Sequence, residues 1–252
     1  MILKLLSYNI CFGGRERQKQ IAETINSIAP DTVVFQEASD PKVIENLSRE
    51  CGMPHWGARE GHSVGFMSRL EIEYYEWHYP EVARHAFLEI QLAGSEARIF
   101  GLHLSARFSK WSERRRHREI QALLKSIERH QHGFHVLVGD FNTLAPGELF
   151  NLPLMPLWIR GLIWLSGNDI RRDTIQTILD AGYADGFRRL YPDDKGYTFP
   201  VWQPHVRLDY IFLPARYADC LQSCEVIKNP PIVTEASDHF PLLSFLEFED
   251  CK

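Results

Sequence analysis

Short apolar runs in this chain repeatedly border a polar side chain, and this pattern constrains the fold more than any other feature. The run 134–138 (Phe-His-Val-Leu-Val) is followed by Gly139, Asp140, Phe141 and Asn142. Five further runs are bordered in the same way, by Asn9, Glu37, His103, Asp209 and the pair Asp238–His239. Apolar runs of this length between turn residues are typical of buried strands. The pattern therefore predicts several buried strands whose ends carry chemically useful side chains.

Segments with helical periodicity alternate with these runs. Apolar residues spaced along 17–29 predict a helix that ends before Pro30, and Pro41 opens a second helix at 41–51. Further helices are expected at 111–129 and 170–181, and further strands at 63–68, 72–77, 86–92, 97–103, 134–139, 207–213, 221–227 and 239–248. Short strands with few helices favour an α/β fold of two sheets packed face to face with helices outside. We expect one domain over residues 1–252, made of two similar halves, 1–130 and 131–252.

Composition and charge restrict the class of protein. The chain is 44% hydrophobic with a net charge of −5, which excludes a uniformly basic surface but allows a local basic groove. Five scattered cysteines without a metal-site spacing are expected to be reduced. No run approaches the ~20 apolar residues of a membrane span, and the first strand lacks the flanks of a signal peptide. A cytoplasmic setting is expected.

The polar residues at the strand ends suit the hydrolysis of a phosphate ester. Such a reaction needs a cation, an activated water and a proton for the leaving oxygen. Glu37 is the best candidate ligand for Mg²⁺, with Mn²⁺ as a substitute, because hard cations prefer carboxylate oxygens. Asn9 either adds a neutral oxygen ligand or holds a carboxylate in place. Asp140 is the candidate base that activates the water.

The remaining residues of this set supply donors. Asn142 could donate to the phosphoryl oxygens, and His239 is suited to face the phosphate, with Asp209 fixing its tautomer and raising its pKa. His103 would be a second donor to the phosphate or the leaving oxygen. Each motif alone is more often a turn or a cap. Their joint occurrence at strand ends predicts a metal-dependent phosphodiesterase.

The same residues resemble the endonuclease/exonuclease/phosphatase superfamily, which includes deoxyribonucleases, abasic-site endonucleases, sphingomyelinases and inositol-polyphosphate phosphatases. The matching blocks are Leu-Ser-Tyr-Asn at 6–9, Phe-Gln-Glu at 35–37, Leu-His-Leu at 102–104, Gly-Asp-Phe-Asn at 139–142, Leu-Asp-Tyr-Ile-Phe at 208–212 and Ser-Asp-His at 237–239. The resemblance implies a four-layer α/β sandwich, Mg²⁺ bound chiefly by Glu37, and a metal-linked carboxylate at Asp238. Two departures are visible: residues 62–69 contain no Asn, and Val206 stands where abasic-site endonucleases carry a Trp.

Three segments bear on the substrate. Basic and aromatic residues alternate in 107–118, beginning with Arg107. This segment either contacts a nucleic acid or is the solvated, salt-bridged start of a helix. The apolar segment 149–165, with Trp158 and Trp164, is either an interfacial wedge for membrane lipid or, as we favour, a buried wall. The aromatic loop 197–205 contains Trp202, which with the nearby Arg207 is a further candidate substrate contact.

The hypothesis favoured by the sequence is a Mg²⁺-dependent phosphodiesterase that acts on DNA or another nucleic acid. The alternative is a lipid or small-molecule phosphoesterase that works at a membrane surface through 149–165. A non-catalytic binding module is disfavoured, because none of the expected catalytic residues is replaced. No obligate protein partner is evident.

Overall fold

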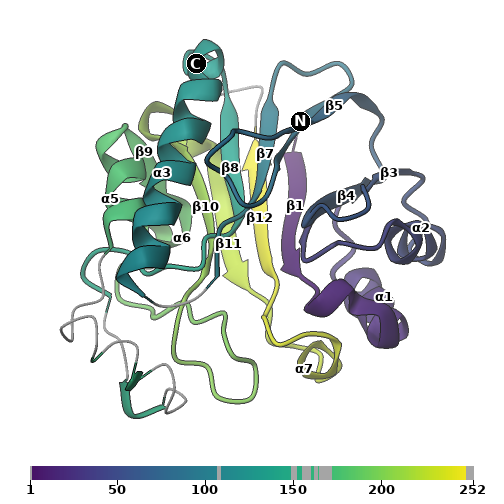
Figure 1. The fold of residues 1–252 in the computed structure, drawn as a ribbon. Helices are drawn as coiled ribbons and strands as arrows, with labels where there is room; N and C mark the ends of the chain where they lie inside the picture. The colour runs from purple at the N-terminus through teal and green to yellow at the C-terminus, as the bar shows by residue number, and fades with distance from the viewer. Residues whose placement is uncertain are drawn as a thin grey trace.

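Two six-stranded mixed sheets form the centre of the protein (Figure 1). The computed structural model describes residues 2–106, 109–148, 152–154, 160–161, 164 and 172–247. Sheet A has the order β11 (Leu221–Val226), β12 (Leu242–Glu247), β1 (Ile2–Asn9), β2 (Thr32–Gln36), β4 (Val64–Ser68) and β3 (His55–Gly57). Sheet B has the order β5 (Ile72–His78), β6 (Phe87–Leu92), β7 (Arg98–His103), β8 (His135–Asp140), β10 (Asp209–Pro214) and β9 (Tyr183–Asp185). The pairs β1–β2 and β7–β8 are parallel and all other pairs are antiparallel.

Helices cover the outer face of each sheet and complete four layers, as the sequence predicted (Figure 1). Helices α1 (Gln18–Ile28) and α2 (Pro41–Glu50) pack on sheet A, and α3 (Lys110–Ser126) and α5 (Asp173–Asp180) pack on sheet B. Of two short helices, α6 (Gly186–Leu190) follows β9, and α7 (Val233–Ala236) precedes β12. Among the described residues no helix is long and apolar enough to cross a bilayer.

The alternation of side chains along the strands aims the strand-end polar residues between the two sheets. Leu5 of β1 and Val138 of β8 belong to the apolar core that lies between the sheets. Successive side chains of a strand point to opposite faces. Asn9 and Asp140 therefore project from the same inner faces as Leu5 and Val138, and Asp209 does so because it pairs directly with Asp140. The apolar core thus gives way to polar side chains at one end of the sandwich.

Most predicted elements are present with shifted ends. The helix expected at 17–29 is preceded by a 3-10 helix, Phe12–Arg17, and the one expected at 111–129 ends at Ser126. The elements β3, β9, α6 and α7 were not predicted, because each is too short to show a periodic apolar pattern. The boundary expected near residue 130 falls between β7 and β8, which are neighbours in sheet B, and each of the two sheets contains strands from both halves.

The cysteine prediction is wrong in one respect. Cys11, Cys51 and Cys224 are free and buried, but Cys220 is disulfide-bonded. The number and spacing of cysteines carry no information about which thiols meet in space. Cys251 lies outside the described residues.

Candidate active site

Three neighbouring strands of sheet B place three polar residues side by side. The register pairs His103 at the end of β7 with Asp140 at the end of β8, and Asp140 with Asp209 at the start of β10. Gly139 makes this close pairing possible: its φ is 148°, and a side chain at this position would clash with the backbone carbonyl of Leu102. The carboxylate of Asp140 therefore stands between His103 and Asp209.

Asn9 of sheet A joins the two sheets at this point. Its Nδ2 atom donates to Oδ2 of Asp140 at 3.0 Å and to Oε1 of Glu37 at 3.3 Å, while its Oδ1 accepts from the backbone N–H of Cys11 at 2.9 Å. Of the two roles expected for Asn9, the structure shows that of holding carboxylates. One amide group thus fixes Glu37 and Asp140 relative to each other.

A strained loop supports Glu37 and presents an aromatic residue that sequence reasoning missed. Glu37 has φ 59°, and Cys11 and Phe12 have φ 50° and 51°, a region that costs about 1–3 kcal/mol for a residue other than glycine. In this conformation the backbone N–H of Phe12 donates to Oε2 of Glu37 at 2.5 Å. The side chain of Phe12 is 87% exposed. Strain of this kind is typical of functional loops.

Asp140 is buried and held by Asn142. The backbone N–H of Asn142 donates to Oδ1 of Asp140 at 2.8 Å, and its Nδ2 donates to Oδ2 of Asp140 at 3.1 Å and to the Leu104 carbonyl at 3.0 Å. The amide of Asn142 therefore orients Asp140 rather than pointing to a phosphate, which differs from the expected role. Burial raises the pKa of Asp140, and nearby Asp209 adds to this, against the opposing effect of His239.

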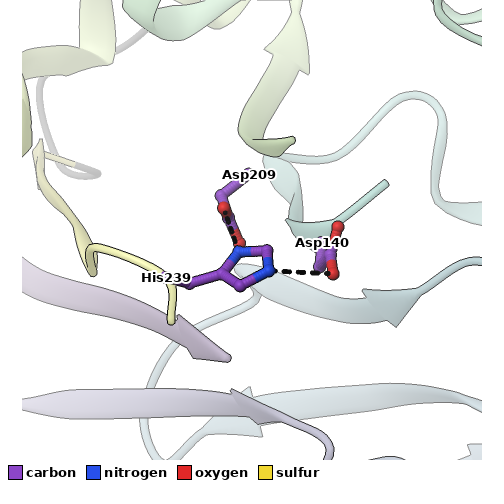
Figure 2. A group of neighbouring side chains, drawn as sticks. All are labelled: Asp140, Asp209 and His239. Carbon is purple, nitrogen blue, oxygen red and sulfur yellow. Dashed lines mark hydrogen bonds and ion pairs between the residues drawn. The ribbon is translucent and has the colours of Figure 1, made fainter. Parts of the chain in front are cut away.

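His239 is paired with Asp209 and faces Asp140. Figure 2 shows its ring between the two carboxylates, with Nδ1 2.8 Å from Oδ2 of Asp209 and Nε2 4.0 Å from Oδ2 of Asp140. Burial alone would lower the pKa of His239, but the Asp209 carboxylate, with Asp140 and Asp238, more than offsets this and raises it to about 10. The imidazole is therefore protonated at neutral pH. Asp238 itself is half-buried, and its backbone carbonyl accepts from Val201 at 3.0 Å.

His103 approaches the same carboxylate from the other side in a different state. Its Nε2 lies 3.7 Å from Oδ2 of Asp140, and its Nδ1 bonds to the hydroxyl of Ser63. The ring of His85 stacks on it at 5.0 Å between centroids. Burial, with nearby His85, His239 and Arg84, lowers the pKa of His103 to about 3, so this imidazole is neutral. Sequence reasoning missed Ser63 and His85, which reach the site only through the fold.

The candidate substrate contacts are placed differently from one another. Trp202 is 72% exposed and lies 6.2 Å from Phe199, whose ring in turn lies 4.8 Å from His239. Arg207 is only 1% exposed, and its guanidinium bonds to Asp185 at 2.5 Å and to Glu148 at 2.8 Å. This placement argues against a substrate contact for Arg207, because both carboxylates already occupy its donors. Arg107 lies outside the described residues.

The profile of the Endonuclease/Exonuclease/phosphatase family matches residues 6–239, which include all the strand-end residues described above. The chain belongs to this family. As a member it is a hydrolase that acts on phosphate ester bonds. No curated protein sequence matches it significantly.

Several solved structures share the fold of this chain. A variant of the 3′ phosphatase NExo from Neisseria, bound to a product DNA hairpin, has a TM-score of 0.73 at 18% identity over 97% of this chain and 99% of that one. An AP endonuclease from Archaeoglobus fulgidus gives the same four values. A humanized TDP2 from D. rerio has a TM-score of 0.66 at 16% identity over 98% and 99% of the two chains. At such identities the likeness shows the shared fold.

Two sets of residues in this family member could hold a metal ion. Among the described residues, ligand atoms of Asp140, Asp209 and His239 lie within 4.8 Å of one another. In this set Nδ1 of His239 is already bonded to Asp209. The second set is Glu37 and Asp140, whose carboxylates both accept from the Nδ2 group of Asn9. Carboxylate oxygens are preferred ligands of a hard divalent cation, so both sets offer suitable groups.

Proposed function

We propose that this protein is a Mg²⁺-dependent phosphodiesterase that cleaves nucleic acid, with DNA as the first substrate to test. One observation carries the proposal: Oδ2 of Asp140 lies 3.0 Å from the amide that also holds Glu37, and 4.0 Å from the protonated imidazole of His239. A cation ligand, a base and a cationic donor therefore meet at one carboxylate. These are the groups that hydrolysis of a phosphodiester requires.

The residues divide the chemistry as follows. Mg²⁺ held by Glu37, with Asn9, would neutralise charge on the phosphoryl oxygens. Asp140 accepts the proton of the attacking water, and its raised pKa favours this acceptance. Asn9 and Asn142 keep its carboxylate in one orientation. Asp238 remains a proposed metal-linked carboxylate.

The two histidines serve the phosphate side of the reaction. The imidazolium of His239 donates to a phosphoryl oxygen from Nε2, while Asp209 retains the proton on Nδ1. His103 adds a neutral imidazole 3.7 Å from Asp140, suited to a hydrogen bond with the phosphate or the leaving oxygen. Each ring is fixed by a hydrogen bond, to Asp209 for His239 and to Ser63 for His103, so both need little reorganisation during the reaction.

Exposed aromatic side chains at the border of the site support a nucleic-acid substrate. Phe12 lies in the loop that holds Glu37 and donates its own backbone N–H to that carboxylate. The ring of Trp202 contacts Phe199, whose ring contacts His239. Both side chains are mostly exposed, and bases stack on such surfaces. Two of the similar structures are named as a DNA-bound 3′ phosphatase and an AP endonuclease. Val206 is fully buried here, which does not favour abasic-site specificity.

The test is hydrolysis with Mg²⁺ of single-stranded DNA, duplex DNA, RNA and mixed phospholipid vesicles, measured in parallel. Asp140→Ala and Glu37→Ala serve as controls, with circular dichroism to show that they fold. Nucleic-acid cleavage that both variants lose supports the proposal. Cleavage that survives in Glu37→Ala would contradict the metal assignment.

A lipid substrate is the second candidate, on the observation that Trp164 is 69% exposed. Of the segment 149–165 the structure describes only 152–154, 160–161 and 164, so Trp158 lies outside it. Release of headgroup from vesicles, with nucleic acid untouched, would favour this candidate. The single-domain organisation over 1–252 and the cytoplasmic setting remain predictions.

A further inference from the structure

One face of α3 carries a stripe of exposed basic and aromatic side chains. Trp111, Arg114, Arg115 and Arg118 follow the spacing i, i+3, i+4 and i+7, which places them on one face of a helix. All four are exposed, and Trp111 is 79% exposed. The opposite face is buried against sheet B through residues that include Ile120. The stripe is therefore a surface feature and makes no contribution to the core.

This stripe forms one wall of a groove with a volume of about 420 Å³. The other wall is the loop between β5 and β6, which contributes Glu81 and Val82. The guanidinium of Arg114 lies 5.6 Å from the centre of the Trp111 ring. A groove lined by arginines and by the Trp111 ring suits a ligand that has both negative charge and flat rings.

The groove has an excess of positive charge, because its three arginines face one carboxylate, that of Glu81. Arg115 lies 3.8 Å from Glu119, but neither Arg114 nor Arg118 has a carboxylate partner within the part of the chain that the structure describes. Like charges four residues apart destabilise a helix, and Arg114 and Arg118 have this spacing. The concentration of arginines also contrasts with the net charge of −5 of the whole chain. An anionic ligand would relieve this repulsion.

The groove is connected to the active site by the loop that follows β5. The backbone N–H of Arg84 donates to Oε1 of Glu119 on α3 at 3.0 Å, and the next residue, His85, stacks on His103. Glu119 also accepts from the backbone N–H of Ser105 at 3.1 Å, just after the strand that ends at His103. The same short loop therefore contacts both His103 and the helix that carries the groove.

We propose that the groove, formed by Trp111, Arg114, Arg115 and Arg118, binds a single-stranded segment of the nucleic acid beyond the cleaved phosphate. The inference rests on the proposed function. Phosphates contact the arginines and one unpaired base stacks on Trp111, which a base within a duplex could not do. Residues 111 to 118 span about 10 Å of helix, so the contact covers a short segment of the strand.

The first test is the salt dependence of binding. Fluorescence anisotropy of a labelled 12-nucleotide single strand, in EDTA to prevent cleavage, gives the slope of log K against log salt. Each lost phosphate contact lowers that slope by about 0.7 for a single strand. The triple variant Arg114→Gln, Arg115→Gln, Arg118→Gln should therefore have a slope smaller by about 2.

A matched control removes the same charge elsewhere. Lys19, Lys42 and Arg49 are exposed on α1 and α2, which cover the other sheet. Their triple replacement by Gln changes the net charge equally and should leave the slope as in the wild type. An equal loss in both triple variants would mean that only overall charge matters, and would overturn the inference.

Trp111 gives a second, independent readout. Trp111→Ala should weaken binding of the single strand at least about fivefold, and Trp111→Phe should restore most of it, because stacking needs an aromatic face. The ratio of kcat/KM on the 12-mer to that on a nucleotide p-nitrophenyl ester should fall in Trp111→Ala. Equal losses on both substrates would indicate a structural role and contradict the proposal.

The outcomes separate this inference from the proposed function. A wild-type protein that neither binds nor cleaves nucleic acid, but hydrolyses another phosphate ester, would overturn the proposed function and the inference with it. A wild-type protein that cleaves nucleic acid, with an unchanged slope in the arginine variant, would overturn the inference alone. The arginine variant could instead lose binding to vesicles of phosphatidylcholine and phosphatidylserine while its oligonucleotide slope stays unchanged. That result would make the groove a membrane contact and would also overturn the inference.

Discussion

The surroundings of His103 and His239 differ although both rings serve the same carboxylate. Both are buried, and their Nε2 atoms lie 3.7 Å and 4.0 Å from Oδ2 of Asp140. The second ring nitrogen of His103 meets the hydroxyl of Ser63, whereas that of His239 meets the carboxylate of Asp209. The pKa is lowered to about 3 in the first and raised to about 10 in the second.

This difference shows that burial alone does not decide the charge of a histidine. Burial lowers the pKa of both rings, and only a carboxylate partner reverses the effect. One cleft thereby contains a charged donor and a neutral one. Such a separation assigns distinct tasks to chemically identical side chains. Four experiments break or sharpen the contrast.

The largest effect is expected from removing the charged ring. His239→Gln should lower kcat/KM about 1,000-fold, because the lost cation faces the charge that develops on the phosphate. His103→Gln should cost less, since it removes a neutral donor. Steady-state kinetics of both variants at pH 7 checks the order, with circular dichroism to confirm folding. A larger loss in His103→Gln would reverse the assigned roles.

The next largest effect is expected from removing the carboxylate that is bonded to Nδ1 of His239. In Asp209→Asn, burial would dominate and the pKa of His239 would fall, so the ring would be neutral at pH 7. We expect activity to fall about 100-fold at pH 7, with the alkaline limb of the pH profile moved to lower pH. Histidine NMR titration provides the direct measurement. An unmoved alkaline limb would show that His239 is not the group responsible.

A smaller effect is expected from removing the partner of the neutral imidazole, His103. Ser63→Ala removes the partner of Nδ1 of His103 and should lower kcat/KM about tenfold, in keeping with one lost buried hydrogen bond. The alkaline limb set by His239 should stay where it is in the wild type. Ser63→Thr keeps a hydroxyl and should recover part of the loss. A shift of the alkaline limb in Ser63→Ala would mean that the two histidine environments are not independent.

The smallest effect concerns stability against pH. The folded-state pKa of His239 is raised, so its contribution is fully present below pH 6.5 and is lost as the pH rises through about 10. That of His103 is depressed, so its contribution is present above pH 6.5 and is lost as the pH falls through about 3. Urea unfolding at several pH values gives the difference in free energy of unfolding between the wild type and each of His239→Gln and His103→Gln. As the pH rises, the first difference should fall and the second should rise. Two differences that change in the same direction with pH would contradict the pKa assignments.

The sequence predicted the polar strand ends because the signal is local. Short apolar runs end at Asn9, Glu37, His103 and Asp140, and strand geometry then decides which face these residues share. The four-layer sandwich follows from the same runs together with the helical segments between them. Elements of three to five residues, such as β9 and α6, are too short for any periodic signal.

The sequence patterns did not show which side chains far apart in the chain would contact one another. Nothing near Arg207 in the chain shows that Asp185 and Glu148 occupy its guanidinium. The approach of Ser63 to His103 depends on contact between the two sheets, and the orientation of Asn142 depends on the carbonyl of Leu104. Residue types thus predicted the chemistry of the site, while the role of each side chain depended on partners brought in by folding.

The position of β1 inside sheet A has a consequence for the time course of biosynthesis. β1 lies between β2 and β12, with Ile2 opposite Glu247, so this sheet is completed only when β12 has emerged from the ribosome. At about 5–20 residues per second, His239 leaves the ribosome roughly 10–50 s after Asn9. During that interval the nascent chain holds one part of its hydrolytic apparatus without the other. The residues gathered around Asp140 can therefore assemble only after β12 has been synthesised.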